Sequence, residues 1–229
     1  MTAKKIERPG VRQGYDLWCG SYDQTPNPVV AMDQRHTLGL LAPRAGEAVL
    51  DAGCGTGRNL SRMSAAGARV VGLDFSLGML RVARSKLPHV PLLQADLQAA
   101  LPLATNCFPA VLCALIGEHL DRLAFTFAEL FRVLAPGGRL VFSVYHPQLA
   151  EAGKEANFEL GQTEYRLGAV RHTIADYTNL ASAAGLAHIE TFEFSGDRGL
   201  VRAIPSAADL LDRPVIFALR ARKPEACYH

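Results

Sequence analysis

The sequence predicts an α/β fold built on a parallel sheet. Between residues 48 and 144, short apolar segments of strand length alternate with segments whose apolar residues recur at helical spacing. This alternation is typical of βαβ units, because two parallel strands need a crossover connection that is usually a helix. The length of 229 residues suits one large domain, although length alone also allows two small ones. We expect a single domain.

Each element between residues 48 and 144 has its own signal. Apolar segments that read as strands lie at residues 48–51, 69–74, 90–95, 108–115 and 139–144. Helical spacing is found at residues 58–66, 76–87 and 121–134. Ser76 and Asp121 are suited to cap the second and third of these helices, and Pro88 stops the second. The third helix ends at residues 135–138, where Pro and Gly cannot continue it.

The remainder of the chain is expected to complete the sheet. Residues 146–171 lose periodicity, so we interpret them as an insertion over the sheet edge. A helix is predicted for residues 173–184, with Thr173 as its cap. Residues 187–194 and 214–221 are predicted to form a closing pair of strands joined by a long polar loop.

Composition makes several classes of partner and compartment improbable. Lys and Arg total 24 against 22 for Asp and Glu, so no summed field favours nucleic acid or anionic lipid. The five cysteines form no C-x-x-C pair, so we expect reduced thiols in a cytoplasmic protein and no metal site. The N-terminal segment lacks the apolar region of a secretory signal, and the longest apolar stretch, 109–117, is far shorter than the ~18 residues of a membrane span.

A glycine-rich turn follows the first predicted strand of the sheet. Gly53, Gly55 and Gly57 alternate there, which allows a ligand to meet main-chain N–H groups at a helix N-terminus. A dinucleotide fingerprint requires a small residue three positions after Gly55, but Arg58 stands there and disfavours a nicotinamide cofactor. Asp51, just before the turn, would repel a pyrophosphate and attract a cationic amine.

Acidic residues also follow the next two predicted strands. Asp74 ends the second strand, from which a carboxylate reaches ribose hydroxyls in nucleotide-binding α/β folds. Asp96 follows the third strand, where it or a backbone group could receive an adenine amino group, with Leu97 against the ring. The alternative for Asp51 and Asp74 is a carboxylate that only stabilises a turn. The alternative for Cys54, a conceivable nucleophile, is a small buried thiol, which is commoner.

Taken together, five segments resemble the motif series of class I S-adenosylmethionine-dependent methyltransferases. They are VLDAGCGTG at 49–57, VVGLDFS at 70–76, QADL at 94–97, the segment 108–120 and LAPGGRLVFSV at 134–144. The resemblance is strong for residues 47–145 and implies a Rossmann-like, seven-stranded, mostly parallel sheet with helices on both faces and an antiparallel last strand. It also divides the domain into an N-terminal helical cover (1–45), a cofactor-binding core (46–145), an acceptor-side insertion (146–172) and the C-terminal part of the sheet (173–229).

The same resemblance implies the cofactor, S-adenosylmethionine, and the residues that bind it. The glycine turn would contact the methionine moiety, and two tyrosines of the N-terminal segment would cover the site. The full set is Tyr15, Tyr22, Asp51, Gly53, Cys54, Gly55, Thr56, Gly57, Asp74, Phe75, Ser76, Met79, Asp96, Leu97 and Leu115.

The methyl acceptor is expected to be a small polar or aromatic metabolite. The fourth strand lacks the Asn/Asp-Pro-Pro-Tyr signature of methyltransferases acting on adenine or amide nitrogen. Candidate bases are His119, His146 and His172, in that order, with Glu118 as uncertain as His119. Candidate acceptor-binding residues are Tyr165, Arg166 and Tyr177.

Three other functions are kept as alternatives to small-molecule methylation. They are a methyltransferase acting on protein or RNA, a catalytically silent methyltransferase-like binding protein, and a nicotinamide-dependent oxidoreductase. The oxidoreductase is the least favoured because the dinucleotide fingerprint fails at Arg58.

Overall fold

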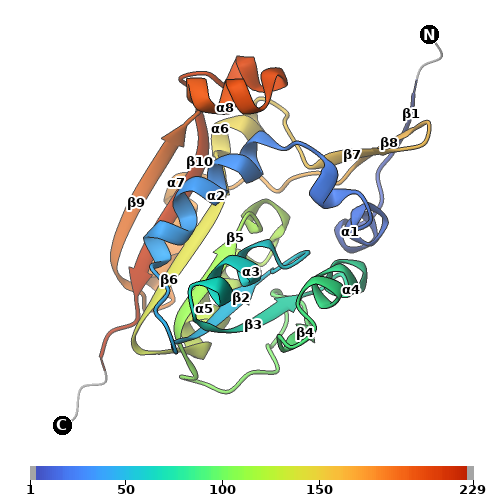
Figure 1. The fold of residues 1–229 in the computed structure, drawn as a ribbon. Coiled ribbons are helices and arrows are strands. Elements are labelled where there is room, and N and C mark those ends of the chain that lie inside the picture. Colours follow the sequence, from blue (N-terminus) through green and yellow to red (C-terminus); the bar gives the residue numbers. More distant parts are fainter. Residues whose placement is uncertain (1–3, 226–229) are drawn as a thin grey trace.

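The computed structural model describes residues 4–225 and contains a seven-stranded sheet in the order β4-β3-β2-β5-β6-β10-β9 (Figure 1). Its strands are β2 Ala48–Ala52, β3 Arg69–Asp74, β4 Leu92–Gln94, β5 Phe108–Ala114, β6 Leu134–Tyr145, β9 Ala187–Ser195 and β10 Pro214–Arg222. The first five pair in parallel, whereas β10 runs antiparallel to both β6 and β9. The predicted fold class, with its antiparallel last strand, is confirmed.

Helices cover both faces of this sheet. The helices are α1 Val11–Trp18, α2 Pro28–Leu41, α3 Arg58–Ala65, α4 Leu77–Lys86, α5 Leu123–Val133, α6 Pro147–Glu151, α7 Ile174–Ala183 and α8 Arg198–Ala203, with 3₁₀ turns η1 Tyr22–Gln24, η2 Gly117–His119 and η3 Pro205–Leu210. Side chains of α2, α3 and α4 pack on one face, against Val49 and Leu112. Those of α5 and α7 pack on the other face, against Leu50 and Phe142. Burial of these apolar stripes is the main stabilising term of the domain.

A second, three-stranded sheet projects beside α1 (Figure 1). It consists of β1 Lys5–Glu7, β8 Thr163–Arg166 and β7 Asn157–Leu160. Strand β8 pairs in parallel with β1 and antiparallel with β7. Trp18 at the end of α1 stacks on Phe158 of β7 with ring centroids 4.9 Å apart, so the small sheet supports the N-terminal helix.

The structure differs from the sequence-based prediction in three segments. Asp121 does not cap α5, because the helix begins two residues later and Arg122 occupies its N-cap position. The insertion at 146–172 is not aperiodic, since it holds α6 and the β7–β8 hairpin. The predicted polar loop before β10 contains α8 and η3, whose Leu200 and Leu210 are buried. Side chains of α6, α8 and η3 pack in one buried cluster with Val215 and Ile216 of β10, whereas the hairpin packs on α1. A local sequence pattern does not reveal such tertiary contacts.

The caps of the other helices follow the sequence. The hydroxyl of Ser76 accepts a hydrogen bond from Met79 N, and Thr173 and Asp176 form a reciprocal capping box at the start of α7. Within residues 4–225, no helix is long and apolar enough to cross a membrane.

Candidate functional site

The glycine turn between β2 and α3 exposes main chain at the carboxyl edge of the sheet. Gly53, Gly55 and Gly57 have φ values of 85°, 53° and 82°, a region that residues with a Cβ rarely adopt. A Cβ on Gly53 would lie 2.5 Å from Ile116 Cδ1. Apart from Gly55 and its two chain neighbours, no described residue has an atom within 4 Å of the position that a Cβ on Gly55 would occupy. The turn therefore presents its backbone to a space that a side chain would fill.

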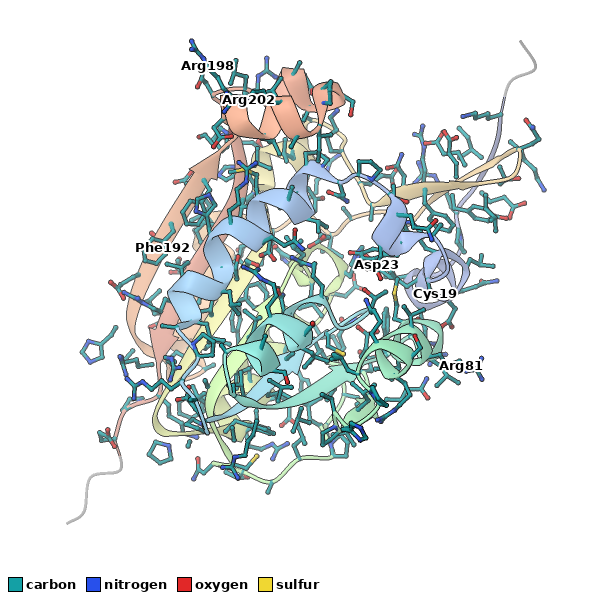
Figure 2. All side chains as sticks on the ribbon, viewed as in Figure 1. Cys19, Asp23, Arg81, Phe192, Arg198 and Arg202 are labelled. Carbon is teal, nitrogen blue, oxygen red and sulfur yellow. The ribbon has the colours of Figure 1, made fainter. Side chains whose placement is uncertain are left out.

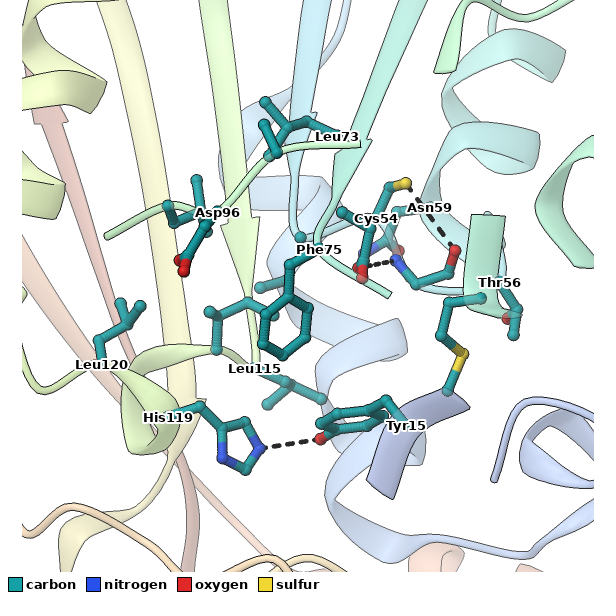
Figure 3. Close-up of a pocket in the computed structure, with 18 of the residues that line it drawn as sticks. Tyr15, Cys54, Thr56, Asn59, Leu73, Phe75, Asp96, Leu115, His119 and Leu120 are labelled. Atoms are coloured by element: carbon teal, nitrogen blue, oxygen red, sulfur yellow. Dashed lines mark hydrogen bonds between the residues drawn. The ribbon is translucent and has the colours of Figure 1, made fainter. Parts of the chain in front are cut away.

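That space is a cavity with about 850 Å³ of empty volume, part of which opens to solvent (Figure 3). Twelve of the fifteen residues expected to bind the cofactor line it: Tyr15, Tyr22, Gly53, Cys54, Gly55, Thr56, Asp74, Phe75, Met79, Asp96, Leu97 and Leu115. Asp51, Gly57 and Ser76 are not part of this lining. Ser76 is used as the cap of α4, and Gly57 is the N-cap of α3.

Asp74 joins the turn to the second strand. Its Oδ2 accepts a hydrogen bond from Gly55 N at 2.8 Å, and its Oδ1 accepts one from Ser76 N at 2.9 Å. The side chain is nearly buried, and desolvation raises its pKa to about 6 despite these hydrogen bonds. Each carboxylate oxygen keeps a further lone pair that a ligand hydroxyl could use.

Asp51 and Arg58 lie next to the turn, but no hydrogen bond joins them. Asp51 is 1% exposed, burial raises its pKa to about 7, and its Oδ2 has no hydrogen-bond donor within the described residues. Arg58 instead bonds Asp33 on α2 at 3.0 Å, where Ser143 Oγ also donates at 2.7 Å. Arg58 also lines the cavity, a role that sequence reasoning missed because it treated this residue only as a breach of the dinucleotide pattern.

The N-terminal segment closes the cavity through polar contacts. Tyr15 OH lies 2.9 Å from His119 Nε2 (Figure 3). Asp16 accepts hydrogen bonds from Ser76 Oγ at 2.6 Å and Gly78 N at 2.8 Å. Asp23 accepts from Thr56 Oγ1 at 2.7 Å and from Lys86 at 2.8 Å. The labelled Cys19 and Asp23 in Figure 2 mark where this segment meets α4.

Sequence reasoning did not find the contacts of Asp16 and Asp23. Their signal is weak, because each is an isolated acid outside a motif. Only the fold brings them to the start of α4 and to the glycine turn.

Of the three candidate histidine bases, only His119 lies at this cavity. Desolvation lowers its pKa to about 4, so the imidazole is neutral at physiological pH. Its Nδ1 is buried and lacks a hydrogen-bond partner in the part of the chain described.

The other two histidines perform structural tasks. His146 is buried, its Nδ1 accepts from Gln148 N at the start of α6, and its Nε2 bonds Glu193 at 2.9 Å. His172 Nε2 bonds the carbonyl oxygen of Leu120 at 2.8 Å. Both lie outside the cavity lining, so the geometry does not support either as a base.

The expected acceptor-binding residues are also used in packing. Tyr165 stacks on Phe158 in the small sheet, with ring centroids 5.0 Å apart. Arg166 pairs with Glu164 at 2.8 Å on the same strand. Tyr177 is buried in the main core against Phe142. These interactions place all three outside the cavities described here.

A second cavity shares one wall with the first. Tyr15, Tyr22 and Leu115 line both. Leu115, directly after β5, has φ 58°, an unusual conformation for a bulky residue that often marks a functional site. The second cavity encloses about 1090 Å³ including its open part, and residues 154–157 of the insertion contribute to it.

The cavity residues suit an organic cofactor better than a metal or a covalent nucleophile. Among residues 4–225, no group of three or more His, Cys, Asp or Glu side chains is arranged to hold a metal. Burial raises the pKa of the Cys54 thiol, which disfavours a reactive thiolate. A cationic, nucleoside-containing ligand fits the donor set, because buried Asp51 Oδ2 lacks a donor and the Gly55 backbone opens to the cavity.

Comparison with known proteins gives matches over the same region. A methyltransferase domain family matches residues 50–142. Demethylmenaquinone methyltransferase of Renibacterium salmoninarum is 35% identical over 162 residues, covering 68% of this chain and 65% of the relative. Malonyl-[acyl-carrier protein] O-methyltransferase of Pectobacterium atrosepticum is 31% identical over 173 residues, covering 76% and 65%. The chain thus spans just under two thirds of the length of these relatives.

A solved structure extends the likeness to the fold. The S-adenosylmethionine-dependent methyltransferase from Mesorhizobium loti superposes with a TM-score of 0.72 at 26% identity, covering 86% of this chain and all of that one. The matched methyltransferase domain contains the glycine turn and the strand ends that carry Asp74 and Asp96. Residues 50–142 therefore match a methyltransferase domain family, and the chain has the Rossmann-like fold of an S-adenosylmethionine-dependent methyltransferase.

Proposed function

We propose that this protein transfers a methyl group from S-adenosylmethionine to a small-molecule acceptor. The observation that carries the proposal is the glycine turn, whose backbone opens onto the first cavity with Asp74 bonded beneath it. In this proposal the turn holds the methionine part, Asp74 accepts the ribose hydroxyls, and Asp96 with Leu97 contacts the adenine. Unpaired Asp51 supplies negative charge below the turn, toward a cationic ligand.

The bound sulfonium supplies a methyl group that is already activated for displacement. The protein's own contribution is then to orient the acceptor, exclude water and receive a proton where the acceptor carries one. Tyr15, Tyr22 and Leu115 separate the two cavities, so we assign the second cavity to the acceptor. The contacts of Asp16 and Asp23 would keep the cover closed over both ligands.

A small acceptor agrees with the second cavity, which is partly open to solvent, and with the demethylmenaquinone methyltransferase named above. A protein or RNA acceptor would need a broad, charged or exposed surface leading to the methyl group. A silent binding protein remains an outcome of the test below, as does a nicotinamide enzyme.

Two measurements test the proposed function. Titration calorimetry should detect binding of S-adenosylhomocysteine and no comparable binding of reduced nicotinamide dinucleotide. Asp74→Asn should weaken S-adenosylhomocysteine binding by about 2 kcal/mol, roughly thirtyfold, because one charged acceptor of two hydrogen bonds is replaced by an amide. Incubation with S-adenosylmethionine and extracts of small metabolites should then yield a product heavier by one methyl group.

Three outcomes would contradict the proposal. Preferential dinucleotide binding would favour the oxidoreductase. Cofactor binding without a methylated product from metabolites, proteins or RNA would favour the silent protein. Methylation confined to the macromolecular fraction would overturn the small-molecule acceptor.

A further inference from the structure

We propose that Glu118 is the catalytic base that receives the proton of the methyl acceptor, and that the second cavity selects an uncharged or cationic aromatic molecule bearing a hydroxyl or amino group. This inference rests on the proposed methyl transfer and adds a residue and an acceptor class to it. The candidate histidines were the expected bases, but the structure points to the residue next to His119.

Glu118 brings a carboxylate with one unpaired oxygen to the second cavity. Its side chain is 10% exposed, and its Oε2 is buried without a hydrogen-bond partner among residues 4–225. A buried carboxylate oxygen without a donor is costly and rare in a folded protein. Glu118 lines the second cavity, whereas His119 lines the first. Glu118 therefore brings its carboxylate to the side of the wall assigned to the acceptor, with one of its two oxygens unpaired.

The backbone holds Glu118 in this place. It lies in the 3₁₀ turn η2, and its carbonyl oxygen accepts a hydrogen bond from Val170 N at 2.8 Å. A Cβ at the preceding Gly117 would lie 2.9 Å from Tyr177 OH, so η2 packs closely on α7. Rigid support of this kind is what a catalytic group requires.

The other charges of the second cavity are already paired. Glu155 accepts two hydrogen bonds from Arg8, at 2.9 and 3.0 Å, and a third from Gly168 N at 2.8 Å. Lys154 pairs with Asp209 at 3.4 Å and is the only cation among the described residues lining this cavity. A carboxylate or phosphate ligand would thus meet negative Glu118 without a free cation, which disfavours anionic acceptors.

Aromatic side chains form much of the rest of the wall. Tyr15, Trp18, Tyr22 and Tyr145 all line the second cavity. Trp18 is 3% exposed, and its buried Nε1 has no acceptor in the described chain. Flat, amphipathic walls of this kind favour an aromatic ligand, and the indole N–H could bond an oxygen of that ligand.

The protonation of Glu118 suits the role of a base. Burial raises its pKa to about 7, with Asp33 adding a smaller upward effect, so the carboxylate is largely ionised at pH 8. Neutral His119 lies 4.0 Å away and does not compete for the proton. Other titratable groups that sense its charge are Tyr15, Tyr22, Cys113, Tyr145 and Tyr177, and burial raises the pKa of each of them, so they remain neutral.

The step balances without another reactant. The acceptor oxygen or nitrogen forms a bond to the methyl carbon, and the carbon–sulfur bond breaks with its electron pair passing to sulfur. That electron pair neutralises the positive charge on sulfur, and the proton of the acceptor moves to the Glu118 carboxylate. The protonated carboxyl then returns its proton to solvent.

Three small probes of similar shape test this assignment. At pH 8 they are tyramine, a phenol with an ammonium group; 4-ethylphenol, which is neutral; and 3-(4-hydroxyphenyl)propionate, which is an anion. Calorimetry on wild-type protein saturated with S-adenosylhomocysteine should give tyramine an affinity at least about tenfold above that of the anion. The neutral phenol should lie between them. Glu118→Gln should reduce the difference between tyramine and the anion to less than about threefold.

Two control measurements distinguish an error in the role of Glu118 from an error in the proposed cofactor site. Glu118→Gln should retain its S-adenosylhomocysteine affinity, because Glu118 lies outside the first cavity. Glu190→Gln, which removes a carboxylate of β9 that pairs with Arg220 of β10, should keep the probe preference of the wild type. Once an acceptor is identified, Glu118→Gln should lower kcat for acceptors with a protonated nucleophile far more than for acidic phenols already ionised at pH 8.

Several results would overturn the inference. The anion could bind as tightly as tyramine, the preference could persist in Glu118→Gln, or no probe could bind to protein that binds S-adenosylhomocysteine. The wild-type comparison alone decides the acceptor class if Glu118→Gln does not fold. If the wild-type protein does not bind S-adenosylhomocysteine, the proposed function itself is contradicted.

Discussion

Asp51→Asn should stabilise the protein without ligand while weakening its cofactor binding. Asp51 is 1% exposed, and its Oδ2 lacks a donor in the described chain. Burial raises its pKa from 3.8 to about 7, so the folded protein holds this proton more tightly than the unfolded chain. Stability is therefore lost as pH rises from about 4 to about 7, the interval between the two pKa values.

The expected size of the effect follows from that interval. Each pKa unit corresponds to about 1.4 kcal/mol, so the raised pKa of Asp51 costs roughly 4 kcal/mol of stability at pH 8, where the carboxyl is ionised in both states. At pH 5, where it is ionised only in the unfolded chain, the cost is roughly 1.5 kcal/mol. Asn has nearly the same shape and carries no charge. The gain in free energy of unfolding from Asp51→Asn should thus be about 2–3 kcal/mol larger at pH 8 than at pH 5.

Urea unfolding at both pH values measures this difference. Asp121→Asn is a matched control, because Asp121 is exposed and its substitution should change stability little at either pH. Affinity for S-adenosylhomocysteine, measured by calorimetry, should fall in Asp51→Asn and stay constant in the control. An equal stability change at both pH values, or a less stable variant at pH 8, would refute the reasoning.

Three further substitutions test other parts of the site. Gly55→Val should fold, but its φ of 53° should lower the free energy of unfolding by about 1–2 kcal/mol. The variant should not bind S-adenosylhomocysteine, because the valine side chain would enter the cavity. Retained binding would contradict the role of the turn. Asp33→Asn, unlike Asp51→Asn, should destabilise the protein by about 3–5 kcal/mol in urea unfolding at pH 8, because Arg58 loses its charged partner. A change below about 1 kcal/mol would show that this ion pair contributes little to stability. His172→Ala should lower stability by about 1 kcal/mol through its lost bond to Leu120 and leave cofactor affinity unchanged in calorimetry; weaker binding would return His172 to the site.

The sheet and the glycine turn could be predicted because their signals are local. Strand length, helical spacing and the glycines at 53–57 specify where β2 ends and how α3 begins. Asp74 was recognised for the same reason, since it follows directly after an apolar strand. The parallel sheet then brings separate strand ends to one edge, which is a consequence of topology alone.

The acceptor side could not be predicted in the same way. Tyr177 and His172 carry the residue types of a site, yet the fold places them in the core and against a backbone carbonyl. The second cavity is assembled from α1, η2 and residues 154–157, which lie far apart in the sequence. Glu118 is a candidate base because one of its carboxylate oxygens has no hydrogen-bond partner in the described chain. A sequence pattern cannot show that a contact is missing.

A crystal structure with S-adenosylhomocysteine tests the central claim most directly. We expect the ligand in the first cavity, with its amino acid part on the glycine turn, its ribose hydroxyls on Asp74 and its adenine beside Asp96 and Leu97. We also expect the sulfur to face the wall shared with the second cavity. Ligand bound elsewhere on the protein, or bound with its ribose away from Asp74, would contradict the account.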